Sequence, residues 1–272
     1  MANTLFVTGV EPRSGKSAII LGIMQLLLRD IQRVAFFRPI INAPASGGKD
    51  HDINLVQSQF NLDMRYSESY SLTMQQAREM INQGQHEALL EKILNDYNAL
   101  TGRFDFILCE GTDFLGSDPA FEFDINADIA ANLGCPVLLV SNGQKKNQDE
   151  IVASTLLTIE SFEDKGLDIL AAIINRVEDV DGEAMVAELK NSIRCPECFP
   201  IYVIPEEARL GKPTVADVLK WLDAKVLYGG DMLSNLVDSY VIAAMQLGNF
   251  LNYIERGGLV ITPGDRSDII LG

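Results

Sequence analysis

An apolar run at residues 5–7 leads directly into a loop framed by Gly9 and Gly15, and a Gly-Lys-Ser sequence ends that loop. Residues 18–28 are densely apolar, which is typical of a helix packed on a sheet. A strand, a glycine-containing loop and a helix in this order point backbone N–H groups and a helix N-terminus at one place, where they can hold a polyphosphate. The chain is therefore expected to begin with a phosphate-binding loop.

The loop is one residue longer than the common phosphate-binding pattern. Gly9 and Gly15 enclose five residues, whereas the pattern G-x-x-x-x-G-K-[ST] has four. In the expected loop, Lys16 supplies a positive charge to the phosphates and Ser17 offers a hydroxyl to Mg2+. The alternative is a strand-to-helix turn of similar composition that binds nothing.

Strand-like apolar runs alternate with helical segments up to about residue 205. The strand-like runs lie at residues 34–37, 104–111, 136–141, 169–175 and 200–204. Helical segments are predicted at residues 53–56, 73–82, 87–100, 123–133, 149–162 and 182–193. Because alternating strands and helices form a parallel sheet with helices on both faces, the pattern predicts a three-layer α/β fold whose sheet is mostly parallel.

Polar residues follow several of these strands. Glu110 and Asn175 each end an apolar run, and Pro205 and Glu206 follow another. Ligands collect beyond the carboxyl ends of parallel strands, so these residues are expected at the same edge as the loop. Glu110 could there reach an Mg2+ that bridges phosphate oxygens, and the Asn175 amide suits the edge of adenine. The alternatives are a solvated strand-end acid for Glu110 and a common turn residue for Asn175.

Asp52 closes a loop that contains Pro and paired Gly, directly before a short helical segment. A carboxylate at this position can cap the helix, or it can reach a metal ion at the phosphate loop. Both interpretations remain open for Asp52.

The alternation of strands and helices stops near residues 210–213, and we place a domain boundary there, with domains at 1–210 and 211–272. The second domain is predicted to be a small α/β unit. A helix is expected at 214–222 and another near 247–254, with strand candidates at 225–228, 240–245 and 258–262. About sixty residues build only a small core, so this unit is expected either to be a fragment or to lean on the first domain or on a partner subunit, and the last favours a homo-oligomer.

The net charge of the chain limits the classes of partner that it is expected to bind. The chain carries 22 Lys and Arg against 38 Asp and Glu, a net charge of −16. Such a surface repels nucleic acid and anionic membranes, whereas a local ring of N–H groups can still hold a nucleotide. No apolar run is long enough to cross a bilayer, and the first residues do not resemble a signal peptide, so a cytoplasmic protein is expected.

The four cysteines fit a reducing compartment. Cys109 and Cys135 lie in apolar runs and are expected to be buried. Cys195 and Cys198 have the spacing of a metal or redox pair. Zinc would need two further ligands, and the two histidines, His51 and His86, are far away in sequence, so a loop with two thiols is the simpler interpretation.

The chain resembles the dethiobiotin synthetase branch of the phosphate-loop ATPases in a set of motifs. They are the loop at residues 9–17, Arg38-Pro39, Asp52, Glu110-Gly111 and Asn175. The chain is more similar still to the N-terminal domain of long-form phosphate acetyltransferases. In that family a DRTGG domain follows, and residues 214–272, with the stretch 261–271, resemble its first half. The resemblance implies a P-loop NTPase-like fold and a chain that ends within the DRTGG domain.

The resemblance also implies roles for residues by position. Lys16 would contact the phosphates of ATP or a related nucleotide, and Ser17, Asp52 and Glu110 would surround Mg2+. Further nucleotide contacts would come from the glycines of the loop and from the other strand-end residues, with Asn175 facing the adenine; they are Gly9, Gly15, Asn175, Pro205 and Glu206.

Two departures argue against synthetase chemistry. Dethiobiotin synthetases carry Thr-Asp-Thr where this chain has Val10-Glu11-Pro12, and Lys where it has Arg38. The resemblance therefore implies a nucleotide-binding regulatory and assembly region without catalytic residues of its own. An acetyltransferase domain in the same polypeptide or complex would make acetyl phosphate and CoA from acetyl-CoA and phosphate. The alternatives are an ATP-dependent carboxylase or ligase of the dethiobiotin synthetase type, and an oligomerisation scaffold that binds no nucleotide.

Overall fold

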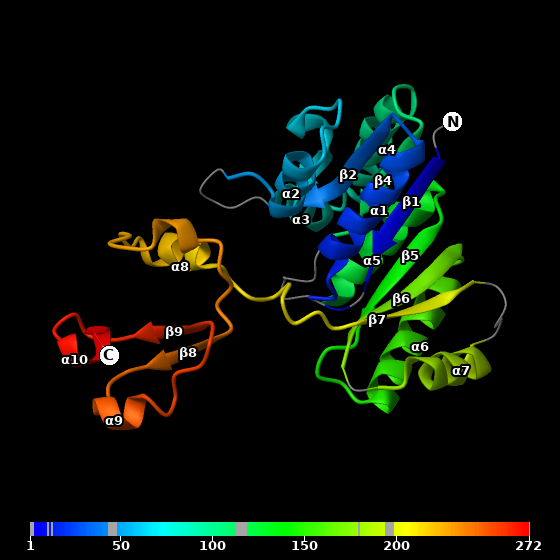
Figure 1. Cartoon of the computed structure of the whole chain (residues 1–272). Coiled ribbons are helices and arrows are strands. Elements are labelled where there is room, and N and C mark those ends of the chain that lie inside the picture. Colours follow the sequence, from blue (N-terminus) through cyan, green and yellow to red (C-terminus); the bar gives the residue numbers. More distant parts are fainter. Residues whose placement is uncertain are drawn as a thin grey trace. The chain divides into compact units, whose positions relative to one another are not determined.

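The computed structural model describes residues 3–9, 11, 13–42, 48–112, 119–178, 180–193 and 199–271, with the backbone alone for 119–122. The chain divides into two compact units, residues 1–206 and residues 207–272 (Figure 1). The boundary predicted after residue 210 lies close to this division and stays a prediction.

The first unit is built on a seven-stranded sheet in the order β3-β2-β4-β1-β5-β6-β7, and all of its pairings are parallel. The strands are β1 (Asn3–Thr8), β2 (Val34–Ile41), β3 (Tyr70–Thr73), β4 (Phe106–Glu110), β5 (Val137–Asn142), β6 (Ile169–Val177) and β7 (Ile201–Pro205). Since β1 lies in the middle, between β4 and β5, the loop that follows it opens at the centre of the carboxyl edge.

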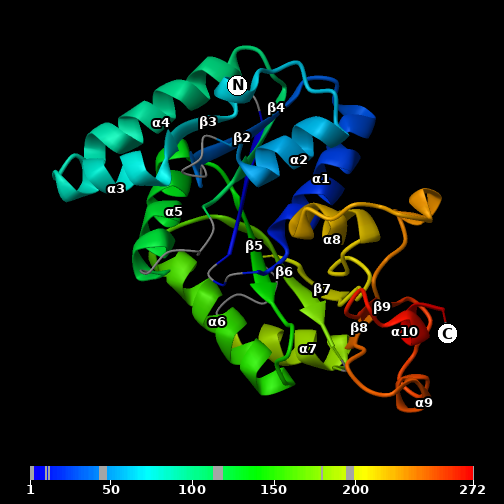
Figure 2. The ribbon, with the colours of Figure 1, turned by 90° about the vertical axis from the view of Figure 1, so that its left-hand side faces the viewer.

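Helices cover both faces of this sheet, as Figures 1 and 2 show. One face is covered by α1 (Lys16–Asp30) and α2 (His51–Gln59), which bury Ile20, Met24, Ile53 and Val56 against it. The opposite face is covered by α3 (Met74–Asn82), α4 (His86–Thr101), α5 (Pro119–Leu133), α6 (Gln148–Asp164) and α7 (Gly182–Ser192). The prediction of a three-layer α/β fold is confirmed. None of the helices that the structure describes is long and apolar enough to cross a membrane.

The sheet is buried on both faces because its strands carry apolar residues at successive positions. In β2, Phe36 packs with the α1 and α2 face, whereas its neighbour Phe37 packs with the opposite face. Phe6 and Val7 in β1 divide between the two faces in the same way. Continuous apolar runs of this kind are what a parallel sheet between two helical layers requires.

Three local features differ from the sequence predictions. β2 does not end at residue 37 but continues through Arg38 to Ile41, and all eight of its residues are buried. The short strand β3 was not predicted, because its sequence YSLT has only one large aliphatic residue. The strand expected at 225–228 is wrong, since these residues form no strand.

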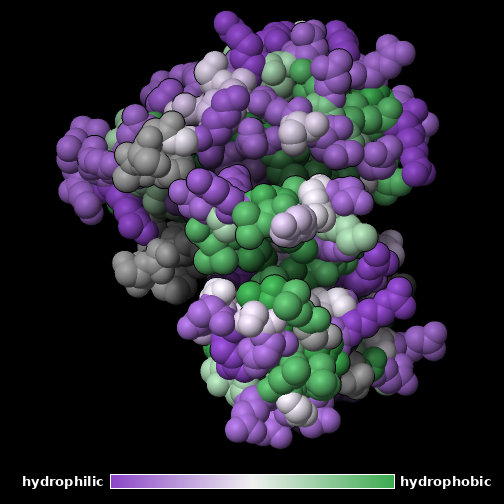
Figure 3. Space-filling model, turned by 60° about the vertical axis from the view of Figure 1, so that its left-hand side comes forward, coloured by the Kyte–Doolittle hydropathy of each residue, from purple (hydrophilic) through white to green (hydrophobic). Residues whose placement is uncertain are grey.

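The second unit has a small core of its own. Its elements are α8 (Val215–Leu222), the 3-10 turn η2 (Gly230–Met232), β8 (Ser239–Ile242), α9 (Leu247–Phe250), β9 (Gly258–Ile261) and α10 (Ser267–Leu271). β8 and β9 form a two-stranded parallel sheet, and Ala243, Phe250 and Ile269 are buried together. Large apolar residues stay exposed in this unit, Trp221 and Tyr240 among them. Figure 3 shows apolar side chains gathered in surface patches between hydrophilic ones.

The two described cysteines lie in the core, as predicted. Cys109 in β4 and Cys135 before β5 are free thiols and buried. Burial raises the pKa of the Cys109 thiol well above its usual value and that of Cys135 to about 12. Cys195 and Cys198 lie outside the described residues.

The core on the α6 face can be tested with Phe162. This side chain is fully buried and meets Phe123 edge to face, with ring centroids 5.1 Å apart. Phe162→Ala is expected to lower the free energy of unfolding by about 3–5 kcal/mol, measured by urea denaturation, because it removes a buried ring and leaves a cavity. Leu157→Ala is the matched control, because Leu157 lies on the same helix and is 65% exposed. Equal effects of the two changes would contradict this packing.

The buried thiols make a second prediction. In a Cys195→Ser/Cys198→Ser variant at pH 8, Cys109 and Cys135 are expected to resist a disulfide thiol reagent, because their raised pKa values keep both sulfurs protonated and the thiolate is the nucleophile. Both should react after unfolding in urea. A thiol that reacts in the folded chain as fast as in the unfolded chain would contradict the burial of that cysteine.

Candidate functional site

The loop between β1 and α1 requires glycine at both of its framing positions. A Cβ atom on Gly9 would lie 2.3 Å from the carbonyl oxygen of Val140, so the backbone of the loop passes too close to β5 for any side chain. Gly15 has a left-handed backbone with φ of 79° and forms the N-cap of α1. Glycine is therefore required at position 9 by the close approach of a neighbouring strand, and at position 15 by the left-handed backbone conformation.

Lys16 lies at the first position of α1 and is buried. Its Nζ donates to the carbonyl oxygens of Gly111 and Thr112, at 3.2 and 3.1 Å. These two residues directly follow β4, so the loop lysine spans from β1 to the end of the neighbouring strand. This brings Lys16 close to the strand end that carries Glu110.

Next to the lysine lies a cluster of buried charges, here named the Arg38 cluster, made of Arg38, Asp50, Asp52 and Glu110. The Arg38 Nη1 contacts both Asp50 oxygens at 2.6 and 2.8 Å and Asp52 Oδ2 at 2.9 Å. The Arg38 Nε lies 3.4 Å from Glu110 Oε2. Ser17 Oγ joins the loop to this cluster by donating to Asp52 Oδ1 at 2.7 Å. Three of the predicted site residues, Ser17, Asp52 and Glu110, are thus brought together around Arg38.

Asp50, not Asp52, caps α2. The Asp50 carboxylate accepts from the backbone N–H groups of Asp52 and Ile53, both at 3.1 Å. The interpretation of Asp52 as the helix cap is therefore wrong, and its carboxylate points to Ser17 and Arg38 instead. Asp50 was missed as a member of the site, although the sequence placed it in the loop that ends in acids before this helix.

The residues predicted to face the base support the loop from the other side. Asn175 Nδ2 donates to the carbonyl oxygen of Ser14 at 2.8 Å, and Arg176 Nη1 donates to that of Arg13 at 3.0 Å. Glu206 holds Arg176 through two hydrogen bonds of 2.8 and 3.0 Å. This pairing lowers the pKa of the Glu206 carboxyl and raises that of Arg176. Asn175 and Glu206 thus lie at the loop, as the topology predicts.

Glu11, inside the loop, is held by residues at and directly after the end of β5. Its carboxylate forms an ion pair with Lys146 and accepts from the backbone N–H of Asn142 at 3.2 Å. Lys146 and Arg176 were not predicted as site residues, because the local sequence does not show that residues so distant along the chain meet the loop. The lysines that follow the strand at 136–141 gave a weak signal.

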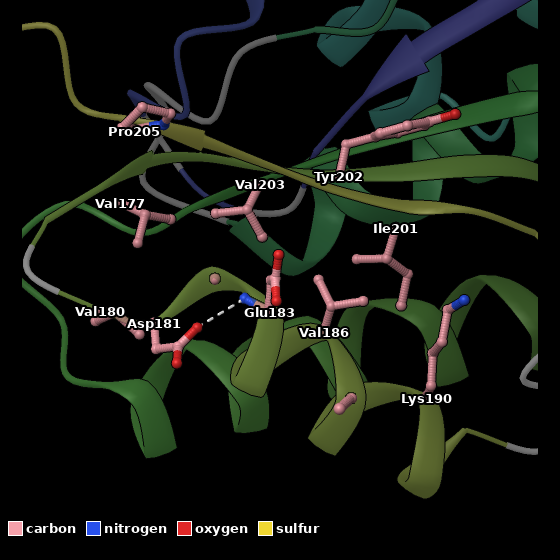
Figure 4. Close-up of a pocket in the computed structure, with 12 residues that line it drawn as sticks. Val177, Val180, Asp181, Glu183, Val186, Lys190, Ile201, Tyr202, Val203 and Pro205 are labelled. Carbon is pink, nitrogen blue, oxygen red and sulfur yellow. Dashed lines mark hydrogen bonds between the residues drawn. The ribbon is translucent and has the colours of Figure 1, made fainter.

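An open groove of about 1000 Å3 lies between α7 and the edge strand β7. Figure 4 shows Val186 and Ile201 directed into it from the helix and the strand, while Tyr202 points away. At one end the Asp181 carboxylate accepts from the backbone N–H of Glu183, as the N-cap of α7. The groove is lined mainly by aliphatic side chains and is distinct from the loop, which carries the charged and polar groups.

The chemistry at the loop suits a phosphate ligand, while its fit to Mg2+ is incomplete. Hydroxyl and carboxylate oxygens such as those of Ser17, Asp52 and Glu110 are the ligands that Mg2+ prefers. In this arrangement, however, both carboxylates are paired with Arg38. Within the described ranges no three His, Cys, Asp or Glu side chains gather in a way that could hold a metal ion. The donors for a metal are present, but Arg38 occupies them.

Known proteins resemble the chain over its whole length. It is 57% identical to the phosphate acetyltransferase of Nitratidesulfovibrio vulgaris over 273 residues and 36% identical to that of Synechocystis, covering 100% of this chain in both cases. The chain spans 39% of the length of each relative. A solved structure of McdA from Cyanothece, in complex with ATP, has 15% identity and a TM-score of 0.48, covering 84% of this chain and 99% of that one.

Two family models match the chain. The model of a DRTGG domain matches residues 217–272, and the model of an AAA domain matches residues 3–214. This order of domains, with relatives that match this chain over its whole length, fits the N-terminal region of long-form phosphate acetyltransferases. The AAA-domain model covers more than half of the residues of this chain. The chain therefore belongs to this AAA-domain family, which has a phosphate-binding loop.

Proposed function

We propose that the chain binds ATP or a closely related nucleotide with Mg2+ at the loop of residues 9–17, and that it is the regulatory and assembly region of a phosphate acetyltransferase. The observation that carries the proposal is the meeting of the glycine-framed loop, Lys16 and Ser17 with Asp52 and Glu110 at one edge of the sheet. In the whole protein, the polypeptide outside this chain would transfer acetyl between CoA and phosphate, as the names of the relatives suggest.

The proposed roles follow the positions of the side chains. Backbone N–H groups of the loop and Lys16 would bind the phosphates, and Ser17, Asp52 and Glu110 would hold Mg2+. Asn175 uses its Nδ2 for the loop, so its Oδ1 would accept from the amino group of adenine. Pro205 and Glu206, at the end of β7, would border the base.

Binding without chemistry is the expected outcome at this loop. Glu11 lies where a dethiobiotin synthetase carries part of its Thr-Asp-Thr sequence, and it is engaged by Lys146 and the Asn142 N–H. A carboxylate held in this way is not available to orient a reacting amine or carbamate. We therefore propose a site that senses a nucleotide and forms no product from it.

The organisation of the whole protein is also a proposal. Residues 1–210 would form the nucleotide-binding domain, and 211–272 would form part of a DRTGG domain with further chain or a partner subunit. Support comes from the small core of the second unit and from its exposed apolar residues. A homo-oligomer in the cytoplasm would bury such surfaces.

Removal of the loop lysine tests the nucleotide site. Lys16→Ala is expected to weaken ATP binding by about tenfold to a hundredfold in isothermal titration calorimetry with Mg2+ present, because a hydrogen bond to a charged group contributes about 1.5–3 kcal/mol. Lys92→Ala is the control, since Lys92 lies on α4 and pairs with Asp96 at the surface. Unchanged affinity in Lys16→Ala would exclude the proposed phosphate contact. If the unaltered chain bound no ATP at millimolar concentrations, a purely architectural role would remain.

The ion pair of Glu11 with Lys146 is expected to hold the loop ready for the nucleotide. Glu11→Gln and Lys146→Met should each weaken ATP binding several-fold, and the double variant should be no weaker than either, because the same interaction is lost in all three. Lys165→Met is the control, since Lys165 pairs with Asp124 and Asp128 on α5. Fully additive losses in the calorimetric cycle would show that the pair does not act as a unit.

A further inference from the structure

Arg38 is a buried charged side chain at the loop, with a relative exposure of 1%. It reaches the site from β2, and its Nη1 and Nε contact three carboxylates, those of Asp50, Asp52 and Glu110. All three carboxylates are buried as well. A guanidinium is suited to this place because it is always charged and presents several donors in a fixed plane.

Two of these carboxylates are the ones that a magnesium ion would need. Mg2+ binds carboxylate oxygens at about 2.1 Å and demands a nearly octahedral set of them. Asp52 Oδ2 already lies 2.9 Å from the Arg38 Nη1, and Glu110 Oε2 lies 3.4 Å from its Nε. Binding of a metal by both oxygens would therefore compete with their ion pairs to the guanidinium.

The charges around the loop also oppose a metal without a nucleotide. Arg38 places a fixed positive charge directly beside the three carboxylates of the Arg38 cluster. A divalent cation at the same carboxylates would lie close to this charge, and repulsion between like charges is strong in a buried environment. Nucleotide phosphates would bring negative charge together with further oxygen ligands.

We propose that Arg38 serves as an internal cation that opposes Mg2+ binding in the absence of nucleotide, so that the metal enters only together with the nucleotide. The idea rests on the proposed nucleotide site. Asp50 makes the exchange feasible, because it holds Arg38 through two contacts of 2.6 and 2.8 Å and would keep it paired once Asp52 and Glu110 turn to the metal. The metal site is thus conditional on the ligand.

The test is a titration with Mg2+ alone, followed by the midpoint of thermal unfolding. The unaltered chain is expected to show no shift in this midpoint. Arg38→Met, which removes the charge and keeps an unbranched side chain, should gain metal binding and a rise of about 5–10 °C at a hundred times its dissociation constant. Arg33→Met is the matched control, because Arg33 is exposed and pairs with Asp105 away from the cluster. This control should respond to Mg2+ as the unaltered chain does.

Two further variants keep the test decisive if Arg38→Met does not fold without metal. Arg38→Lys retains a positive charge, but a lysine contacts fewer of the acids. It should therefore gain Mg2+ binding as Arg38→Met does, to a smaller extent. Arg38→Met/Glu110→Gln also removes one of the two carboxylates proposed to bind the metal and should lose the response to Mg2+. The proposal is overturned if the unaltered chain binds Mg2+ alone as tightly as Arg38→Met, or if neither Arg38 variant gains a response.

These titrations contain no nucleotide, so their outcome is separate from that of the ATP-binding experiment. The unaltered chain could fail to bind ATP while Arg38→Met gains Mg2+ binding. That result would refute the proposed function but would still support the effect of Arg38 on the metal. In the unaltered chain, a non-hydrolysable ATP analogue should restore a thermal shift that depends on Mg2+. A shift with the analogue that is the same in Mg2+ and in a chelator would overturn the conditional entry of the metal.

Discussion

Parallel pairing of β1 with β4 on one side and β5 on the other determines where the phosphate loop lies. The chain leaves β1 between the carboxyl ends of its two neighbours, so side chains of one loop reach both. Lys16 contacts the residues that follow β4, and Glu11 contacts the last residue of β5. The close approach of Gly9 to Val140 is the cost of this central position, because the loop has to pass directly over a neighbouring strand.

The architecture could be predicted from the sequence because a two-sided core leaves a strong local signal. Uninterrupted apolar runs identified most of the strands, and the polar residue that ends each run indicated the functional edge, as Glu110 and Asn175 illustrate. The predicted end of a strand was wrong where a charged residue is buried inside the protein. Arg38 and Pro39 resemble the end of a strand, yet β2 continues to Ile41 because the arginine is neutralised inside the protein.

The contacts between side chains at the site could not be predicted from the sequence in the same way. The pairs of Glu11 with Lys146 and of Arg176 with Arg13 join residues more than 130 positions apart, and only the strand order brings them together. The Asp50 cap shows a different difficulty, since two acids in one short stretch offer the same chemistry and only the backbone geometry selects between them. The strand expected at 225–228 failed because apolar composition alone supplies no pairing partner.

The extra residue of the loop explains why so many side chains support it. A longer loop has more conformations to lose when it binds a ligand, so an unsupported loop would bind phosphates weakly. Three non-glycine residues at this edge, Arg13, Lys145 and Arg176, have left-handed backbones that cost roughly 1–3 kcal/mol each. Contacts of Asn175 and Arg176 with the carbonyl oxygens of Ser14 and Arg13 offset this strain. Residues outside the phosphate-binding pattern therefore support the part of the loop that directly precedes α1.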